Sequence, residues 1–65
     1  MPQRPPAPGD RVLVPFGFTE LEGEVLRTSI GHRGLTVTVA VEVEGADHPI
    51  VNNYPVSEVT ATSAA

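Results

Sequence analysis

Nine consecutive residues, from Thr36 to Glu44, alternate between two kinds of side chain, and this constrains the fold more than any other feature. Valine occupies every second position, and the positions between hold threonine, alanine or glutamate: Val37, Val39, Val41 and Val43 against Thr36, Thr38, Ala40, Glu42 and Glu44. A period of two places the valines on one face of a β-strand, whereas a helix would scatter them around its axis. Valine and threonine also favour strands. The segment therefore predicts a strand with one buried and one solvated face.

Four further strands are expected, because turn-forming residues separate the remaining short apolar runs. We place them at residues 11–16, 24–29, 49–53 and 58–60. Residues 17–23 are expected to be irregular, residues 30–34 to form a hairpin tip, and residues 45–47 to form a turn. Residues 54–57 suit a tight turn or a single 3₁₀ turn. No ten-residue window has the apolar spacing of an amphipathic helix.

Five short antiparallel strands could form a flat meander or a closed barrel. A flat sheet would leave one apolar face that this short chain cannot cover, whereas a curled sheet encloses that face and shortens the exposed edges. The fold class expected is therefore all-β, a single small five-stranded antiparallel barrel. Its interior would contain Val12, Val14, Val25, Val37, Val39, Val41, Ile50 and Val59. Periodicity alone does not decide which of Ile50 and Val51 points inward.

The composition divides the chain into three parts. Residues 1–8 hold four of the seven prolines, so we expect a flexible, disordered, proline-rich N-terminal arm. Its P-x-x-P spacings, Pro2 with Pro5 and Pro5 with Pro8, leave open a role as a ligand arm. Residues 9–60 form the barrel domain, and residues 61–65 a flexible tail.

The absence of cysteine excludes a disulfide framework and a thiolate zinc site. The chain also lacks the apolar run of a signal peptide or of a membrane helix, so we expect a cytoplasmic protein with no membrane partner. Domains of this size usually need a staple, a very regular core or a partner.

The chain carries eight acidic residues against four arginines, a formal net charge of −4. A negative protein repels phosphate backbones, so nucleic-acid binding by bulk charge is disfavoured. An alternative function remains a nucleic-acid-associated barrel that uses Arg11, Arg27, His32 and Arg33. A further alternative is an acidic surface that imitates nucleic acid.

No catalytic site is expected. None of the serines lies in a nucleophile motif, and a barrel this small has a filled interior. His32 and His48 fall in separate loops without metal-ligand spacing, so we expect neither metal nor cofactor. His32 and Arg33, between two glycines, could contact an anion.

The layout resembles the SH3-like barrels, including the Tudor and KOW-type groups. The resemblance covers residues 9–60 and depends on three motifs: Gly9-Asp10-Arg11-Val12-Leu13-Val14, Gly23-Glu24-Val25 and Tyr54-Pro55-Val56-Ser57-Glu58-Val59. It implies a binding module for peptides, partner subunits or nucleic acid. Asn53-Tyr54 is similar to a pair in the proline-peptide groove of true SH3 domains, but the chain has no tryptophan for that groove. Three aromatic residues, of which Phe16 is expected in the core, are too few for a Tudor-type cage.

Phe18 and Leu21 are bulky apolar residues in an otherwise small and polar segment. They would either cap an open end of the barrel or, with Tyr54 and Val56, form a patch for another protein. An acidic rim of Glu20, Glu22 and Glu24 would favour a basic partner. The function expected is a non-enzymatic interaction module that binds a protein partner or self-associates through this patch.

Overall fold

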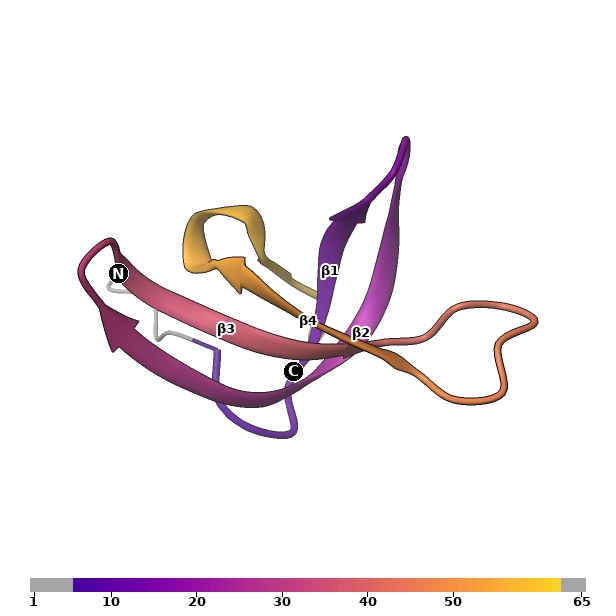
Figure 1. Cartoon of the computed structure of the whole chain (residues 1–65), viewed down its shortest axis with the longest axis horizontal. Helices are drawn as coiled ribbons and strands as arrows, with labels where there is room; N and C mark the ends of the chain where they lie inside the picture. Colours follow the sequence, from indigo (N-terminus) through magenta and orange to yellow (C-terminus); the bar gives the residue numbers. More distant parts are fainter. Residues whose placement is uncertain (1–5, 63–65) are drawn as a thin grey trace.

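The computed structural model describes residues 6–62, which form one sheet of five antiparallel strands (Figure 1). The strands are β1 (Arg11–Phe16), β2 (Thr19–Gly31), β3 (Gly34–Val41), β4 (Ile50–Pro55) and β5 (Thr60–Ala61), with one 3₁₀ turn, η1 (Val56–Glu58), before the last. Their order in the sheet is β4-β3-β2-β1-β5. The all-β prediction is therefore confirmed. No helix in residues 6–62 is long and apolar enough to cross a membrane.

The long strand β2 links the two halves of the sheet. Its first part pairs with β1, from Thr19 to Glu24, and its later part pairs with β3, from Gly23 to Gly31. The register shifts between Val25 and Arg27, and such a bulge bends a strand and increases its twist. Figure 1 shows the result: the β1–β2 hairpin rises away from the β2–β3 hairpin. The sheet is curled because β2 bends at this bulge.

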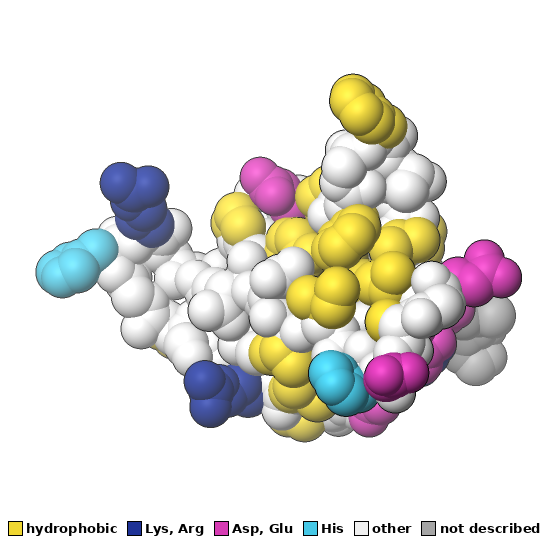
Figure 2. Space-filling model, turned by 45° about the vertical axis from the view of Figure 1, so that its right-hand side comes forward, with side chains coloured by type: hydrophobic (Ala, Val, Ile, Leu, Met, Phe, Trp, Pro, Cys, Tyr) yellow, Lys and Arg dark blue, Asp and Glu magenta, His cyan; other side chains and the backbone are white. Residues whose placement is uncertain are grey.

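The core lies on the concave side of this curl. Six valines are essentially inaccessible and Tyr54 is 8% exposed; the valines are Val12, Val14, Val25, Val37, Val39 and Val41. Half-buried apolar residues pack around them: Phe16, Leu21, Val43, Val56 and Val59. Figure 2 shows hydrophobic side chains at the surface below the β1–β2 hairpin, although the six core valines themselves are inaccessible. The predicted valine face of residues 36–44 is confirmed for its first three valines.

Ile50 does not take the core position expected for it. Ile50 lies opposite Val41 and Tyr54 lies opposite Val37, so both share the core-facing side of β4. Tyr54 fills the buried position, whereas Ile50 remains 39% exposed and Val51 55% exposed. Ile50 is the first residue of β4, where the strand leaves the 42–49 loop.

The expected closure of the barrel is wrong. In the part of the chain that the structure describes, β4 pairs with β3 and β5 pairs with β1, but no ladder joins β4 to β5. β5 has only two residues, and η1 occupies the connection between the two edges. Val56 and Val59, from this connection, pack against the core in place of a closing ladder.

The bounds of four strands differ from the prediction. β3 is Gly34–Val41 rather than residues 36–44, and β4 is Ile50–Pro55 rather than residues 49–53. β2 begins at Thr19, so residues 19–23, expected to be irregular, belong to a hairpin. The last strand is Thr60–Ala61 rather than residues 58–60.

The outward face of β3 is also less solvated than expected. Thr38, predicted on the wet face, is only 7% exposed, and its hydroxyl donates a hydrogen bond to Asn53 Oδ1 at 2.6 Å.

The two ends of the domain are held against the sheet. Residues 1–5 of the expected arm and residues 63–65 of the expected tail lie outside the described residues. The Ala7 amide donates to the Asp10 carboxylate at 2.9 Å, and the Gly9 amide donates to the Val25 carbonyl at 2.8 Å. At the other end, the amide and the hydroxyl of Thr62 both donate to the Arg11 carbonyl, at 3.2 Å and 3.1 Å. The N-terminal segment is therefore anchored on β2 and the C-terminal segment on β1.

Candidate interaction surface

Phe18 occupies the tip of the β1–β2 hairpin. Phe16 and Thr19 form the last pair of the ladder, so Gly17 and Phe18 make the turn. Gly17 has a φ of 65°, in the left-handed region that favours glycine and that tight hairpins require. The Phe18 side chain is fully exposed, at 110% of its reference accessibility. Phe18 therefore does not cap the sheet.

Leu21, the second residue of the predicted pair, points the other way. It lies opposite Val14 on the core-facing side of β2 and is half-buried against the core. Glu20 and Glu22 project from the opposite face, because neighbouring residues of a strand alternate between faces. Leu21 therefore packs against the core, whereas Phe18 does not.

Tyr54 and Val56 also belong to the core rather than to an exposed patch. Tyr54 is buried, and its hydroxyl accepts a hydrogen bond from Asn52 Nδ2 at 3.4 Å. Val56 is half-buried against the same cluster. A buried Tyr54 cannot line an exposed proline-peptide groove. The structure brings Leu21, Tyr54 and Val56 together in or around the core and leaves Phe18 outside.

The acidic rim forms a row along the outward face of β2. Glu20, Glu22 and Glu24 are exposed at alternate positions, which places successive Cα atoms about 7 Å apart along the strand. Glu20 and Glu24 make no ion pair among residues 6–62. A partner that meets this face of the hairpin therefore meets carboxylates beside Phe18.

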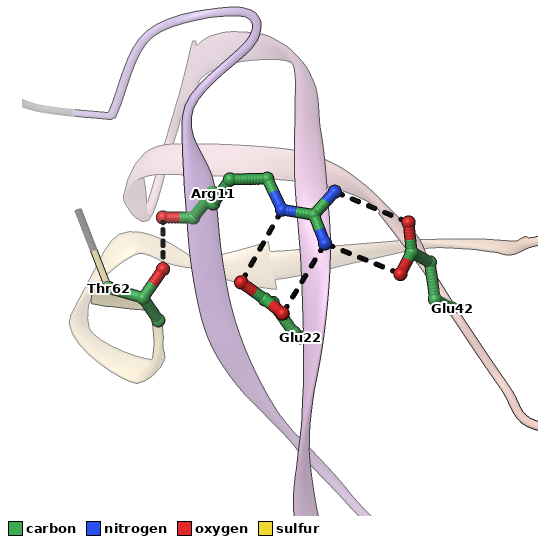
Figure 3. Close-up of polar contacts among 4 residues, drawn as sticks. All are labelled: Arg11, Glu22, Glu42 and Thr62. Atoms are coloured by element: carbon green, nitrogen blue, oxygen red, sulfur yellow. Dashed lines mark hydrogen bonds and ion pairs between the residues drawn. The ribbon is translucent and has the colours of Figure 1, made fainter. Parts of the chain in front are cut away.

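Arg11 interrupts the row by bridging two carboxylates (Figure 3). Its Nη2 lies 3.4 Å from Glu22 Oε1, and its Nη1 lies 3.2 Å from Glu42 Oε2. The hydrogen bonds to Glu42 and then to Glu22 raise the pKa of Arg11 above its ordinary value. Arginine is protonated at neutral and mildly alkaline pH, so the bridge keeps its positive charge there. Arg11 is therefore engaged within the domain.

The other two arginines that the structure describes lie on the β2–β3 hairpin. His32 and Arg33 form the turn at its tip, as predicted, and Arg27 lies on β2 near the bulge; all three are exposed. Figure 2 shows dark-blue and cyan side chains at the left-hand tip, away from most of the magenta ones. The tip of the β2–β3 hairpin is thus apart from most of the acidic side chains seen on this face.

Several exposed apolar residues were not identified from the sequence. Ile30 is 85% exposed and Leu26 is 45% exposed, alongside Ile50 and Val51 of β4. Ile30 pairs with Leu35 where the hairpin extends past the core, and Leu26 lies at the bulge. The exposure of Ile30 and Leu26 depends on the pairing register of β2 with β3, which the sequence does not give.

No cluster of three or more metal-ligating side chains occurs within residues 6–62. No family model, curated protein or solved structure matches the chain.

Proposed function

We propose that this domain is a non-enzymatic interaction module that binds a protein partner, with Phe18 as the main contact. The observation that supports the proposal is the complete exposure of Phe18 on a hairpin tip. Burying a phenylalanine side chain in an interface is worth about 1.5–3 kcal/mol. Aromatic residues, phenylalanine among them, are enriched in protein interfaces relative to the rest of the surface. Self-association through the same side chain is an alternative to binding another protein, and light scattering distinguishes the two.

The charges around Phe18 favour a basic partner. Glu20 stands two residues from Phe18, and Glu22 and Glu24 continue the row along β2. A second copy would bring the same carboxylates together, which opposes self-association at low salt. A partner with lysine or arginine around an apolar pocket would complement this hairpin.

The fold proposal that accompanies this function is an open SH3-like barrel. Three features support it: the β4-β3-β2-β1-β5 order, the long β2 with a bulge that bends it, and the 3₁₀ turn between β4 and β5. Folds of this kind serve many functions, so the argument for binding depends on Phe18 and not on the architecture.

The test is a quantitative capture experiment from the native host with wild-type, Phe18→Ser and Ile30→Ser baits. Phe18→Ser is expected to reduce recovery of a basic protein by about tenfold or more, as for a contact that dominates an interface. Ile30 is the matched control, since it is also a large exposed apolar residue on a hairpin. Light scattering at several protein concentrations measures self-association in parallel.

The proposal fails if the two variants recover the same proteins in the same amounts as wild type. A dimer that Phe18→Ser dissociates would replace the basic partner by a second copy. Both variants change exposed side chains, so their stabilities should remain within about 0.5 kcal/mol of wild type, measured by thermal unfolding.

A second candidate function, binding to nucleic acid, is favoured by the cationic end of the β2–β3 hairpin. His32 and Arg33 form this tip and Arg27 lies farther along β2 near the bulge, whereas Arg11 is bonded to Glu22 and Glu42. Two or three phosphate contacts would make the logarithm of the affinity fall with the logarithm of the salt concentration with a slope of about −2 to −3. Fluorescence anisotropy with single-stranded and duplex oligonucleotides measures it, and the Arg33→Gln variant should flatten the slope. No binding at low salt eliminates this candidate.

The carboxylate row gives less support to imitation of nucleic acid. Its central member, Glu22, is partly neutralised by Arg11, so the row lacks the uninterrupted charge of a phosphate backbone.

A further inference from the structure

β4 is an unpaired edge of the sheet. Within residues 6–62 it pairs with β3 on one side only, since the sheet does not close. Along the free side of such a strand, backbone N–H and C=O groups remain without a partner strand, which makes the edge a template for another strand. The opposite edge, β5, has two residues, whereas β4 has six. β4 is thus the longer of the two outer strands and is long enough to accept another strand.

β4 also lacks most of the features that protect edge strands. Natural edges carry charged side chains, prolines or bulges that prevent further pairing. None of the six residues of β4 is charged, and its single proline is at the last position: Ile50, Val51, Asn52, Asn53, Tyr54 and Pro55. The register with β3 runs without a shift along the whole strand. Ile50 and Val51 expose apolar surface on opposite faces of this edge.

We propose that β4 accepts an extended segment of another protein as a sixth strand, and that basic residues flank this segment. The proposal rests on the proposed function as an interaction module but uses a different surface from Phe18. Backbone hydrogen bonds would supply the affinity, and alternate side chains would supply the specificity. Ile50 and Tyr54 share the core-facing side, so apolar residues at alternate positions of the incoming strand would meet that side.

Acidic side chains beyond the two ends of β4 favour basic residues on either side of the incoming segment. Glu44 and Asp47 lie in the loop before the strand, and Glu58 lies in η1 after it; all three are exposed. Arg27 lies on the outward face of the sheet, level with the middle of β4. It pairs with Thr38 of β3, which in turn pairs with Asn53 of β4. The favoured segment is therefore uncharged in the centre and basic at both ends.

A second copy of this chain fits the edge less well. Antiparallel pairing of β4 with β4 would bring the loop that holds Asp47 near the partner copy's η1, which holds Glu58. Like charges in close proximity oppose such pairing. The acidic surroundings of β4 thus select a basic segment over self-pairing.

The test uses the full chain and a synthetic probe peptide of alternating valine and threonine, with a lysine pair at each end. Amide hydrogen exchange, followed by NMR, is measured with and without the peptide. Strand addition protects alternate amides of residues 50–54, because the intervening amides already face β3. Two control peptides complete the design: one with glutamate pairs at the ends, and one with a proline in the centre that removes a ladder donor.

We expect new alternate protection in β4 with the lysine-flanked peptide, about tenfold weaker binding of the glutamate-flanked peptide at low salt, and loss of protection with the proline peptide. The inference is overturned if the lysine-flanked peptide leaves the exchange of β4 unchanged. Protection of the same amides that grows with protein concentration, without peptide, would also overturn it by showing that a second copy pairs there. The Phe18→Ser variant should retain the β4 protection, so failure of the proposed function and failure of this inference give different results.

Discussion

Gly23 is buried at the position where β2 pairs with both β1 and β3. It lies in β2 between two buried core residues, Val12 of β1 on one side and Val41 of β3 on the other. A Cβ at this position would stand 2.5 Å from Val39 Cγ1 and 2.7 Å from the Ala40 carbonyl oxygen. Real Cβ atoms do not approach other atoms so closely, so β3 passes over Gly23 at a distance that only glycine allows. The role of this glycine is close approach rather than a positive φ.

Gly23→Ala should therefore destabilise the domain. An added methyl in a packed interior forces side chains and backbone to shift, at a cost of about 1–3 kcal/mol. Urea unfolding measures the free energy, and Gly31→Ala is the matched control, because it lies in the same strand with no atom within 4 Å of its added Cβ. The control should stay within about 0.5 kcal/mol of wild type. Equal midpoints for the two variants would show that β3 does not pass close to Gly23.

For the strands, the alternation of apolar and polar side chains predicted their positions better than it predicted how they pair. The first strand, residues 11–16, matches β1, and the alternation of residues 36–44 found the buried valines of β3. Residues 19–23 were misjudged because glycines at 17 and 23 suggested a loop, although Glu20, Leu21 and Glu22 alternate as in a strand. Closure could not be deduced, since it depends on strand twist and on the length of β5.

The candidate surface was only partly predictable for the same reason. The sequence shows that Phe18 and Leu21 are apolar and close together. Where β2 begins, and which of its residues face the core, decides that Phe18 is exposed and Leu21 half-buried. Predicting that Tyr54 is buried also requires the pairing register of β4 with β3, which places Tyr54 opposite Val37. The His32-Arg33 tip was predictable because its flanking glycines mark the turn locally.

At the scale of the whole molecule, the open sheet predicts an uneven distribution of stability. A chain of this length has a free energy of unfolding of about 3–10 kcal/mol, supported here by one small valine core. Residues 36–41 of β3 are paired on both sides, with β2 and with β4, so consecutive amides all have ladder partners. β5 contributes two residues to one ladder. Opening β5 breaks few contacts, whereas opening β3 removes the core.

Native-state hydrogen exchange should reveal this difference. The amides of Val37, Val39 and Val41 are expected to exchange only through global unfolding, with a denaturant dependence equal to that of equilibrium unfolding. Those of Thr60 and Ala61 are expected to exchange at least about 100-fold faster, through local fraying with little denaturant dependence. Equal protection of β3 and β5 would contradict this expectation, because it would show that β5 opens only together with the valine core.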